Sequence, residues 1–376
     1  MTRGLSDRLL ELFREVTEIR ERNYAIDHVR IAAMFFIVLG HFLIFRESGL
    51  EAASFGNTPI HSDGDYIGLI LLGFAIIGTN LFFLITGYFG SKLKLSKILS
   101  LILITYFWGG IVQAILLASG RITLTILVHT LIRLLDRYWF MEVYLVLVLA
   151  SPLLNAFLKS TTLKQKITLV IVWFLVLCVY GFAHDCTRIG VANGFSFVWA
   201  AFMYVVGNVI REIIEQVPAK IERRARARWI YAASTAVYIA VCFFLTKTNR
   251  YTTMWRFAVS YNNPLVVFAS VSFFFLFAAK KDAKGNRFIR FLSGTTIGVY
   301  LIHTAPNLDI FRFFKLRTDT IPVSLLFVAE ILLGSALIYL TCALLDTIRQ
   351  HTIHPSVNRL LQKLEERITG LVHKQD

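Results

Sequence analysis

The sequence predicts an all-α integral membrane protein with about ten transmembrane helices and both termini in the cytoplasm. Three observations predict this fold class. Of the 376 residues, 56% are hydrophobic and only 17% are charged, and the mean hydropathy is +0.63. The apolar residues gather into stretches long enough to cross a bilayer. The Lys and Arg residues fall mainly in alternate connections between those stretches.

The same composition excludes several other classes of protein. A water-soluble enzyme would have about 25% charged residues, and an aromatic fraction of 14% excludes a disordered chain. The net charge of +15 is compatible with nucleic-acid binding, but the basic residues lie in short runs between apolar stretches, so no nucleic-acid partner is expected. Cys178, Cys186, Cys242 and Cys342 have no CxxC spacing, and we interpret them as packing residues.

The membrane spans follow from length, since a helix needs about 20 predominantly apolar residues to cross the hydrocarbon core. The predicted spans are Ile26–Phe45, Tyr66–Tyr88, Ile98–Ala118, Tyr138–Leu158, Ile167–Ala183, Val191–Ile210, Trp229–Leu245, Pro264–Ala279, Phe291–Phe311 and Ile321–Leu345. The second and ninth are rich in Gly and polar residues, so function is expected there.

The orientation follows from the basic residues. One alternating set of connections, which includes both termini, holds 27 of the 39 Lys and Arg residues, and the other set holds 11. Cytoplasmic loops carry the excess of Lys and Arg, so both termini are predicted to be cytoplasmic. The expected organisation is an amphipathic N-terminal segment on the inner leaflet (1–23), a membrane domain (24–346) and an amphipathic cytoplasmic tail (347–376).

Ionisable residues within the first predicted span are the strongest candidates for a functional site. Arg30 and His41 are eleven residues apart, about 1100° of helical rotation, so only about 20° separates their directions. Asp27 lies three residues before Arg30 and can form an ion pair with it. His41 lies about 16 Å further along the axis, toward the outer half of the membrane. Arg30, Asp27 and His41 are therefore the predicted catalytic residues.

Structural alternatives stay open for these residues. Asp27 and Arg30 can instead anchor the helix at the inner interface, with the arginine reaching lipid headgroups. His41 can instead bond to a neighbouring helix for packing alone. An imidazole at that depth needs a polar partner and titrates near neutrality, which favours a functional role.

Four short patterns together resemble a known family. They are Arg30-x10-His41, the segment GTNLFFLITGY at 78–88, Trp139-Phe140-x3-Tyr144 with Pro152, and Tyr300-Leu301-Ile302-His303. In this order, over nearly the whole chain, they resemble membrane-bound acyltransferase family 3, which comprises bacterial surface-polysaccharide O-acyltransferases. The chain departs from the family pattern at Asn80 and Thr86, and has lysines after the second span where relatives commonly have arginines.

The resemblance implies a multi-pass enzyme of the bacterial plasma (inner) membrane. Such an enzyme takes an acyl group, expected to be acetyl, from acyl-CoA and places it on a hydroxyl of a glycan or lipid-linked saccharide. No permanently bound cofactor is implied, because acetyl-CoA is a substrate. His41 matches the proposed catalytic histidine, and Arg30 matches an arginine proposed to be essential.

The residues themselves agree with this chemistry. Acyl transfer to a hydroxyl needs a base, a cation or dipoles for the thioester oxygen and CoA phosphates, and exclusion of water. His41 can act as that base or as an acyl carrier. Arg30 and the inner-loop residues Lys92, Lys94 and Lys97 are the predicted acyl-CoA-binding residues. No Gly-x-Ser-x-Gly elbow and no HExxH pattern occurs in the sequence.

Five further residues are predicted to bind substrate: Glu142, Tyr300, His303, Asn80 and Trp139. Tyr300 and His303 share a helix face, and Pro306 and Asn307 are expected to break that helix beside a cavity. A structural hydrogen bond for Glu142 and an interfacial-belt role for Trp139 remain alternatives.

A glycan or lipid exporter, or another transporter, is the alternative function, because buried charges also mark translocation paths. The two halves of the sequence show no convincing similarity, which favours the enzyme.

Overall fold

The computed structural model describes residues 22–48, 63–184, 189–216, 221–280, 284–311 and 325–353, and, after these, residues 355–357, 359–361, 363 and 365. These described residues are mostly helical and include no strand. The amphipathic N-terminal segment predicted for 1–23 lies outside them, apart from Arg22 and Asn23.

Helices follow one another along the chain with short connections. In order they are α2 (Tyr24–Ser48), α3 (Asp63–Ala75), α4 (Gly78–Phe89), α5 (Leu95–Ala118), α6 (Leu124–Ile132), α7 (Leu134–Arg137), α8 (Trp139–Ser160), α9 (Leu163–Trp173), the π-helix η2 (Phe174–Tyr180), α10 (Gly181–His184), the 3₁₀ helix η4 (Ala192–Gly194), α11 (Phe197–Gln216), α12 (Ile221–Lys247), α13 (Tyr251–Val259), α14 (Pro264–Ala278), α15 (Arg287–Gly294), α16 (Thr296–His303) and α17 (Leu325–Thr352).

The predicted fold class is confirmed. Within the described residues, nine helical stretches are long and apolar enough to cross a membrane. Large apolar side chains point outward from them, such as Leu153 and Leu326, which are more than 70% exposed. Water would penalise such a surface and lipid does not, so this is an integral membrane protein.

The predicted ninth span is not one continuous helix. It consists of α15, α16 and an irregular segment, residues 304–309, in which Asn307 has a φ of 62°. Pro306 lacks an amide hydrogen, and asparagine tolerates the left-handed conformation, so the helix ends at His303 as expected. Gln113 of α5 donates a hydrogen bond to the carbonyl of Pro306 and thereby satisfies backbone that has left the helix.

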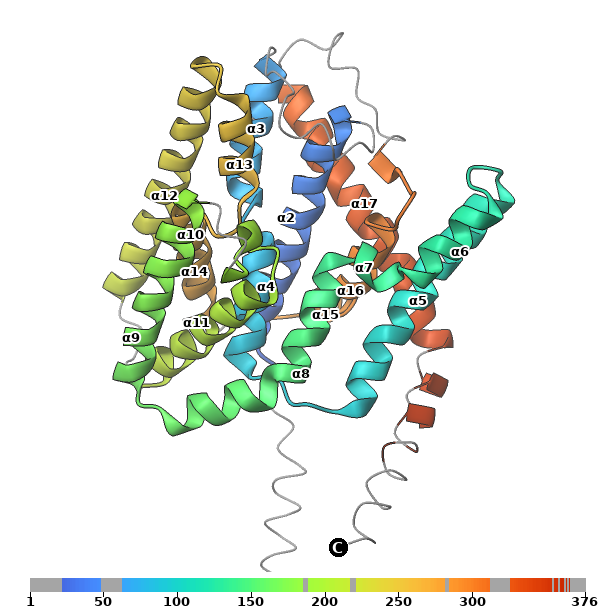
Figure 1. The fold of residues 1–376 in the computed structure, drawn as a ribbon, viewed down its shortest axis with the longest axis horizontal. Helices are drawn as coiled ribbons and strands as arrows, with labels where there is room; N and C mark the ends of the chain where they lie inside the picture. The colour runs from blue at the N-terminus through green and yellow to red at the C-terminus, as the bar shows by residue number, and fades with distance from the viewer. Residues whose placement is uncertain are drawn as a thin grey trace, which may run out of the picture.

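Helix α2 lies at the centre of the bundle. It packs against α3, α4 and α14 and also against α15, α16 and α17 (Figure 1). Its side chains therefore face the protein interior on several sides. A polar stripe on this helix can line an internal cavity, whereas on a peripheral helix the same stripe would face lipid.

Hydrogen bonds join the helix ends that carry the predicted cytoplasmic loops. Arg22, just before α2, bonds to Ser293 of α15, and Ser91, after α4, accepts from Asn155 near the end of α8. Lys166 near the start of α9 pairs with Glu212 near the end of α11, at 2.6 Å. These contacts place basic connections at the end of the bundle where α2 begins, which we call the basic end.

Candidate functional site

Two cavities flank α2, and one tyrosine lines both. The outer cavity, of about 450 Å³, is lined by His41, Trp139, His303 and residues 304–309, among others. The inner cavity, of about 320 Å³, is lined by Arg30, Thr86, Tyr144 and Ser293, among others, and lies toward the basic end. Tyr300 lines both cavities. Arg30 and His41 thus face successive parts of one internal seam, as their spacing predicts.

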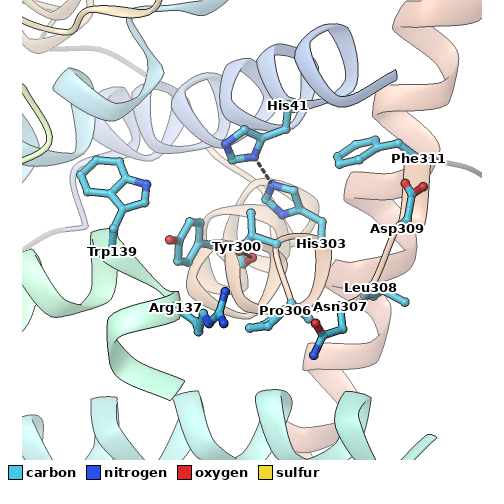
Figure 2. Close-up of a pocket in the computed structure, with 12 residues that line it drawn as sticks. His41, Arg137, Trp139, Tyr300, His303, Pro306, Asn307, Leu308, Asp309 and Phe311 are labelled. Atoms are coloured by element: carbon cyan, nitrogen blue, oxygen red, sulfur yellow. Dashed lines mark hydrogen bonds between the residues drawn. The ribbon is translucent and has the colours of Figure 1, made fainter. Parts of the chain in front are cut away.

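His41 is hydrogen-bonded to His303, across 262 residues of sequence (Figure 2). The Nδ1 atom of His41 lies 3.0 Å from Nε2 of His303, and Nδ1 of His303 lies 2.6 Å from the carbonyl oxygen of Val299. A carbonyl only accepts, so Nδ1 of His303 carries the proton and Nε2 accepts from His41. Neutral His41 is then protonated on Nδ1, and its Nε2 carries the lone pair that a base or nucleophile needs.

Helix α16 is fixed so that His303 stays in this position. The hydroxyl of Tyr138 donates to the carbonyl of Leu301 at 2.8 Å. On another side, Gly298 lies so close to Asp346 of α17 that a β-carbon there would collide with the carboxylate. His303 is 1% exposed. The position of His303 is therefore held by contacts on two sides of α16.

Arg30 forms the ion pair that its spacing with Asp27 predicts, with Nη1 3.0 Å from Oδ1. Asp27 is 3% exposed and also accepts from Arg22 at 2.5 Å. Arg22 in turn donates to Ser293, which lines the inner cavity. Two guanidinium groups share one carboxylate, so this end of the inner cavity keeps one net positive charge. Such a site suits a phosphate or a developing oxyanion.

Aromatic rings separate the two cavities. Phe140 packs edge-on against Tyr300 with ring centroids 5.4 Å apart and stacks on Tyr144 at 5.9 Å. The ring of Phe82 adds to this group of aromatic side chains, with its centroid 6.0 Å from that of Phe140. A wall of side chains can admit a small group by rotamer changes while it keeps bulk water out.

The outer cavity combines an aromatic surface with polar backbone. Trp139 stacks on Tyr261 at 5.9 Å and contacts Phe195 at 4.7 Å. Across from it, Asn307 donates to Gln113 and Thr130, which fixes the irregular segment that follows α16. The sequence motifs did not single out Arg137 or Asp309, although both line this cavity. The sequence feature that could have identified Arg137 as a residue of this cavity is its position two residues before Trp139.

The structure places other predicted site residues away from both cavities. Asn80 is fully buried, accepts from Trp199 and donates to Tyr261 and Ser270, so its amide joins helices in the core. Glu142 lies on the exposed side of α8. Neither residue lines the inner or outer cavity, so the structure does not bring them to the histidines.

The three predicted acyl-CoA-binding lysines do not line the inner cavity. Lys92 and Lys94 are exposed in the connection before α5, and Lys97 donates to Ser91 at 2.9 Å. Their charges remain at the basic end, outside the enclosed part of the site.

The fold and the site define an integral membrane protein with a hydrogen-bonded pair of histidines, the half-buried His41 and the buried His303, on the outer of two cavities. The family model for acyltransferase family 3, described as an acyltransferase domain, matches residues 23–345. The chain therefore belongs to this family and is an acyltransferase. Neither the curated proteins nor the solved structures that were compared include a match to it.

Proposed function

We propose that this protein moves an acetyl group from acetyl-CoA to a hydroxyl of a cell-surface glycan or lipid-linked saccharide in the bacterial plasma membrane. The observation that carries the proposal is the arrangement of the two cavities around Tyr300. One holds a cation at the basic end, and the other holds a histidine pair beside an aromatic surface. A donor from the cytoplasm and an acceptor from the other side can meet at that shared wall.

The size of the inner cavity suits part of an acyl-CoA molecule. The volume of about 320 Å³ suits the pantetheine arm with a short acyl group, but not the whole of CoA. The nucleotide would remain at the basic end, where Lys92 and Lys94 are exposed and can contact its phosphates. Arg30 would stabilise negative charge on the donor, and the aromatic wall would limit hydrolysis of the thioester.

His41 would supply the base. Its Nε2 takes the proton from the acceptor hydroxyl as the oxygen attacks the thioester carbonyl carbon; the carbon–sulfur bond then breaks, and CoA leaves as a thiolate that takes up a proton. His303 holds Nδ1 of His41 and stabilises the imidazolium that forms. The same Nε2 lone pair would serve if His41 carried the acyl group transiently.

The test uses purified protein in proteoliposomes with radiolabelled acetyl-CoA and cell-envelope glycan. Removing a general base costs about 10²- to 10⁴-fold in rate, so His41→Ala should lower acceptor labelling by at least about 100-fold. His351→Ala is the control, because that histidine is exposed near the end of α17 and lines neither cavity.

Unchanged labelling in His41→Ala would overturn the catalytic assignment. Glycan that crosses the bilayer while no acetyl-CoA is consumed would support the transporter alternative instead. Label that wild type, but not His41→Ala, retains after rapid denaturation at neutral pH in the absence of acceptor would support a carrier role for His41, and absence of that label in wild type would support the base.

A further inference from the structure

Arg137 places a cation on the outer cavity that the acyl-transfer mechanism does not use. Among the described residues, no hydrogen bond or ion pair involves its guanidinium. The neighbouring acid, Asp136, already pairs with Arg133 at 2.5 Å. Arg30 at the inner cavity differs in this respect, because Asp27 accompanies it.

The chain on both sides of Arg137 is firmly anchored. Leu134, at the start of the four-residue helix α7, is fully buried and fills the space left by Gly109 of α5. Tyr138 is also fully buried and donates to Leu301 of α16. The backbone of Arg137 is therefore fixed relative to the helix that carries His303, while its long side chain stays free to adjust to a ligand.

The surroundings of Arg137 indicate what kind of ligand it faces. Figure 2 shows Arg137 near Pro306 and Tyr300, on the same cavity as His41 and Trp139. Asn307 commits its amide group to Gln113 and Thr130, and Asp309, the acid on this cavity, has a partner of its own. A guanidinium presents five donors in a plane, which matches the two oxygens of a carboxylate or phosphate.

We propose that Arg137 binds an oxyanion on the acceptor, so that the acylated saccharide carries a carboxylate or a phosphate close to the reacting hydroxyl. The sugar ring would lie on Trp139, the oxyanion on Arg137, and the hydroxyl at His41. The proposal rests on the proposed function, because it assigns the outer cavity to the acceptor.

The experiment measures binding and needs no turnover. The full chain in nanodiscs of uncharged lipid is titrated with three probes, followed by saturation-transfer NMR: methyl glucoside, methyl glucuronoside and glucose 6-phosphate. At least one anionic probe should bind wild type about tenfold more tightly than the neutral one, which corresponds to about 1.4 kcal/mol. Which anion is preferred distinguishes a uronate from a sugar phosphate. The preference should shrink as salt is raised.

Arg137→Gln should remove the preference and leave methyl glucoside binding unchanged, and Arg137→Lys should keep part of it, since a lysine keeps the charge without the planar fork. Arg133→Gln is the matched control, because Arg133 is exposed, paired with Asp136 and absent from the cavity lining. Equal binding of all probes by wild type, failure of every probe to bind, or a preference that survives Arg137→Gln would overturn the proposal.

A further variant separates this proposal from the proposed function. His41→Ala should bind the anionic probe with the wild-type preference. If that preference holds while acyl transfer proves independent of His41, the catalytic assignment fails and the anion site stands. If transfer depends on His41 and Arg137→Gln changes nothing, the anion site alone fails.

Discussion

The inner and outer cavities share Tyr300 but are built differently. Helices α2, α4, α8, α15 and α16 line the inner cavity, and its arginine is held by Asp27. The outer cavity is closed largely by the irregular segment 304–309 and by the end of α7, where Arg137 has no described ionic partner. Under the proposed function, the inner cavity would offer the donor an arginine held by a buried carboxylate, and the outer cavity would offer the acceptor an arginine whose side chain can adjust to its ligand.

The largest effect on kcat should come from loss of the hydrogen bond between His41 and His303, which both line the outer cavity. His303→Ala removes the group that fixes the protonated nitrogen of His41, and should lower kcat by about 100-fold while the KM for acetyl-CoA stays within about twofold. In His303→Gln the side-chain oxygen can still accept from Nδ1, so this variant should recover part of the loss. Steady-state rates over a pH series measure both.

The pH series also separates positioning from packing. A positioning role predicts that the pH profile of kcat changes in His303→Ala and returns toward wild type in His303→Gln. Equal rate losses in both variants, with an unchanged profile, would mean that His303 only supports the helix.

The sequence predicted how Asp27, Arg30 and His41 lie relative to one another on the first helix. The eleven-residue spacing of Arg30 and His41 and the three-residue spacing of Asp27 and Arg30 are local properties of one helix, and helical geometry determines them. The bond between His41 and His303 joins positions far apart in sequence, and no helical period specifies which helices become neighbours. The resemblance to the family named both histidines without showing that they touch.

Asn80 and Glu142 show where sequence reasoning reaches its limit. Both lie in helices that are apolar around most of their circumference, so the pattern does not distinguish a face toward a cavity from a face toward lipid or toward the core. The predicted spans place Arg137 only in a connection, just before the span that begins at Tyr138, because its location beside a cavity depends on the hydrogen bond that joins Tyr138 to Leu301 of α16.

Tyr300, which lines both cavities, provides the second test of how the inner and outer cavities differ. Tyr300→Ala should connect the two cavities and admit water to the thioester, so hydrolysis of acetyl-CoA in the absence of acceptor should rise several-fold. Release of free CoA, followed with a thiol reagent, measures it. Tyr300→Phe keeps the ring and should keep donor hydrolysis low. Equal hydrolysis in wild type and Tyr300→Ala would show that other rings suffice to separate the cavities.

The smallest effect concerns α16, the helix that carries Tyr300 and His303. In Gly298→Ala the new methyl group meets the Asp346 carboxylate, which is 1% exposed and accepts from Trp108, Arg349 and Gln350. A carboxylate bonded in this way cannot move aside cheaply, so α16 must shift, at a cost of about 1–3 kcal/mol. Thermal unfolding in detergent should show a lower Tm.

Gly110→Ala is the matched control, because nothing lies within 4 Å of a β-carbon at that helical position. Alanine is favoured over glycine inside a helix by about 0.5–1 kcal/mol, so the Tm of this variant should stay equal or rise. Because α16 carries both Tyr300 and His303, a shift of this helix should impair donor retention and acceptor transfer together. If Gly298→Ala lowered only one of these activities, the two cavities would not depend on a common position of α16, and Tyr300 would not couple them.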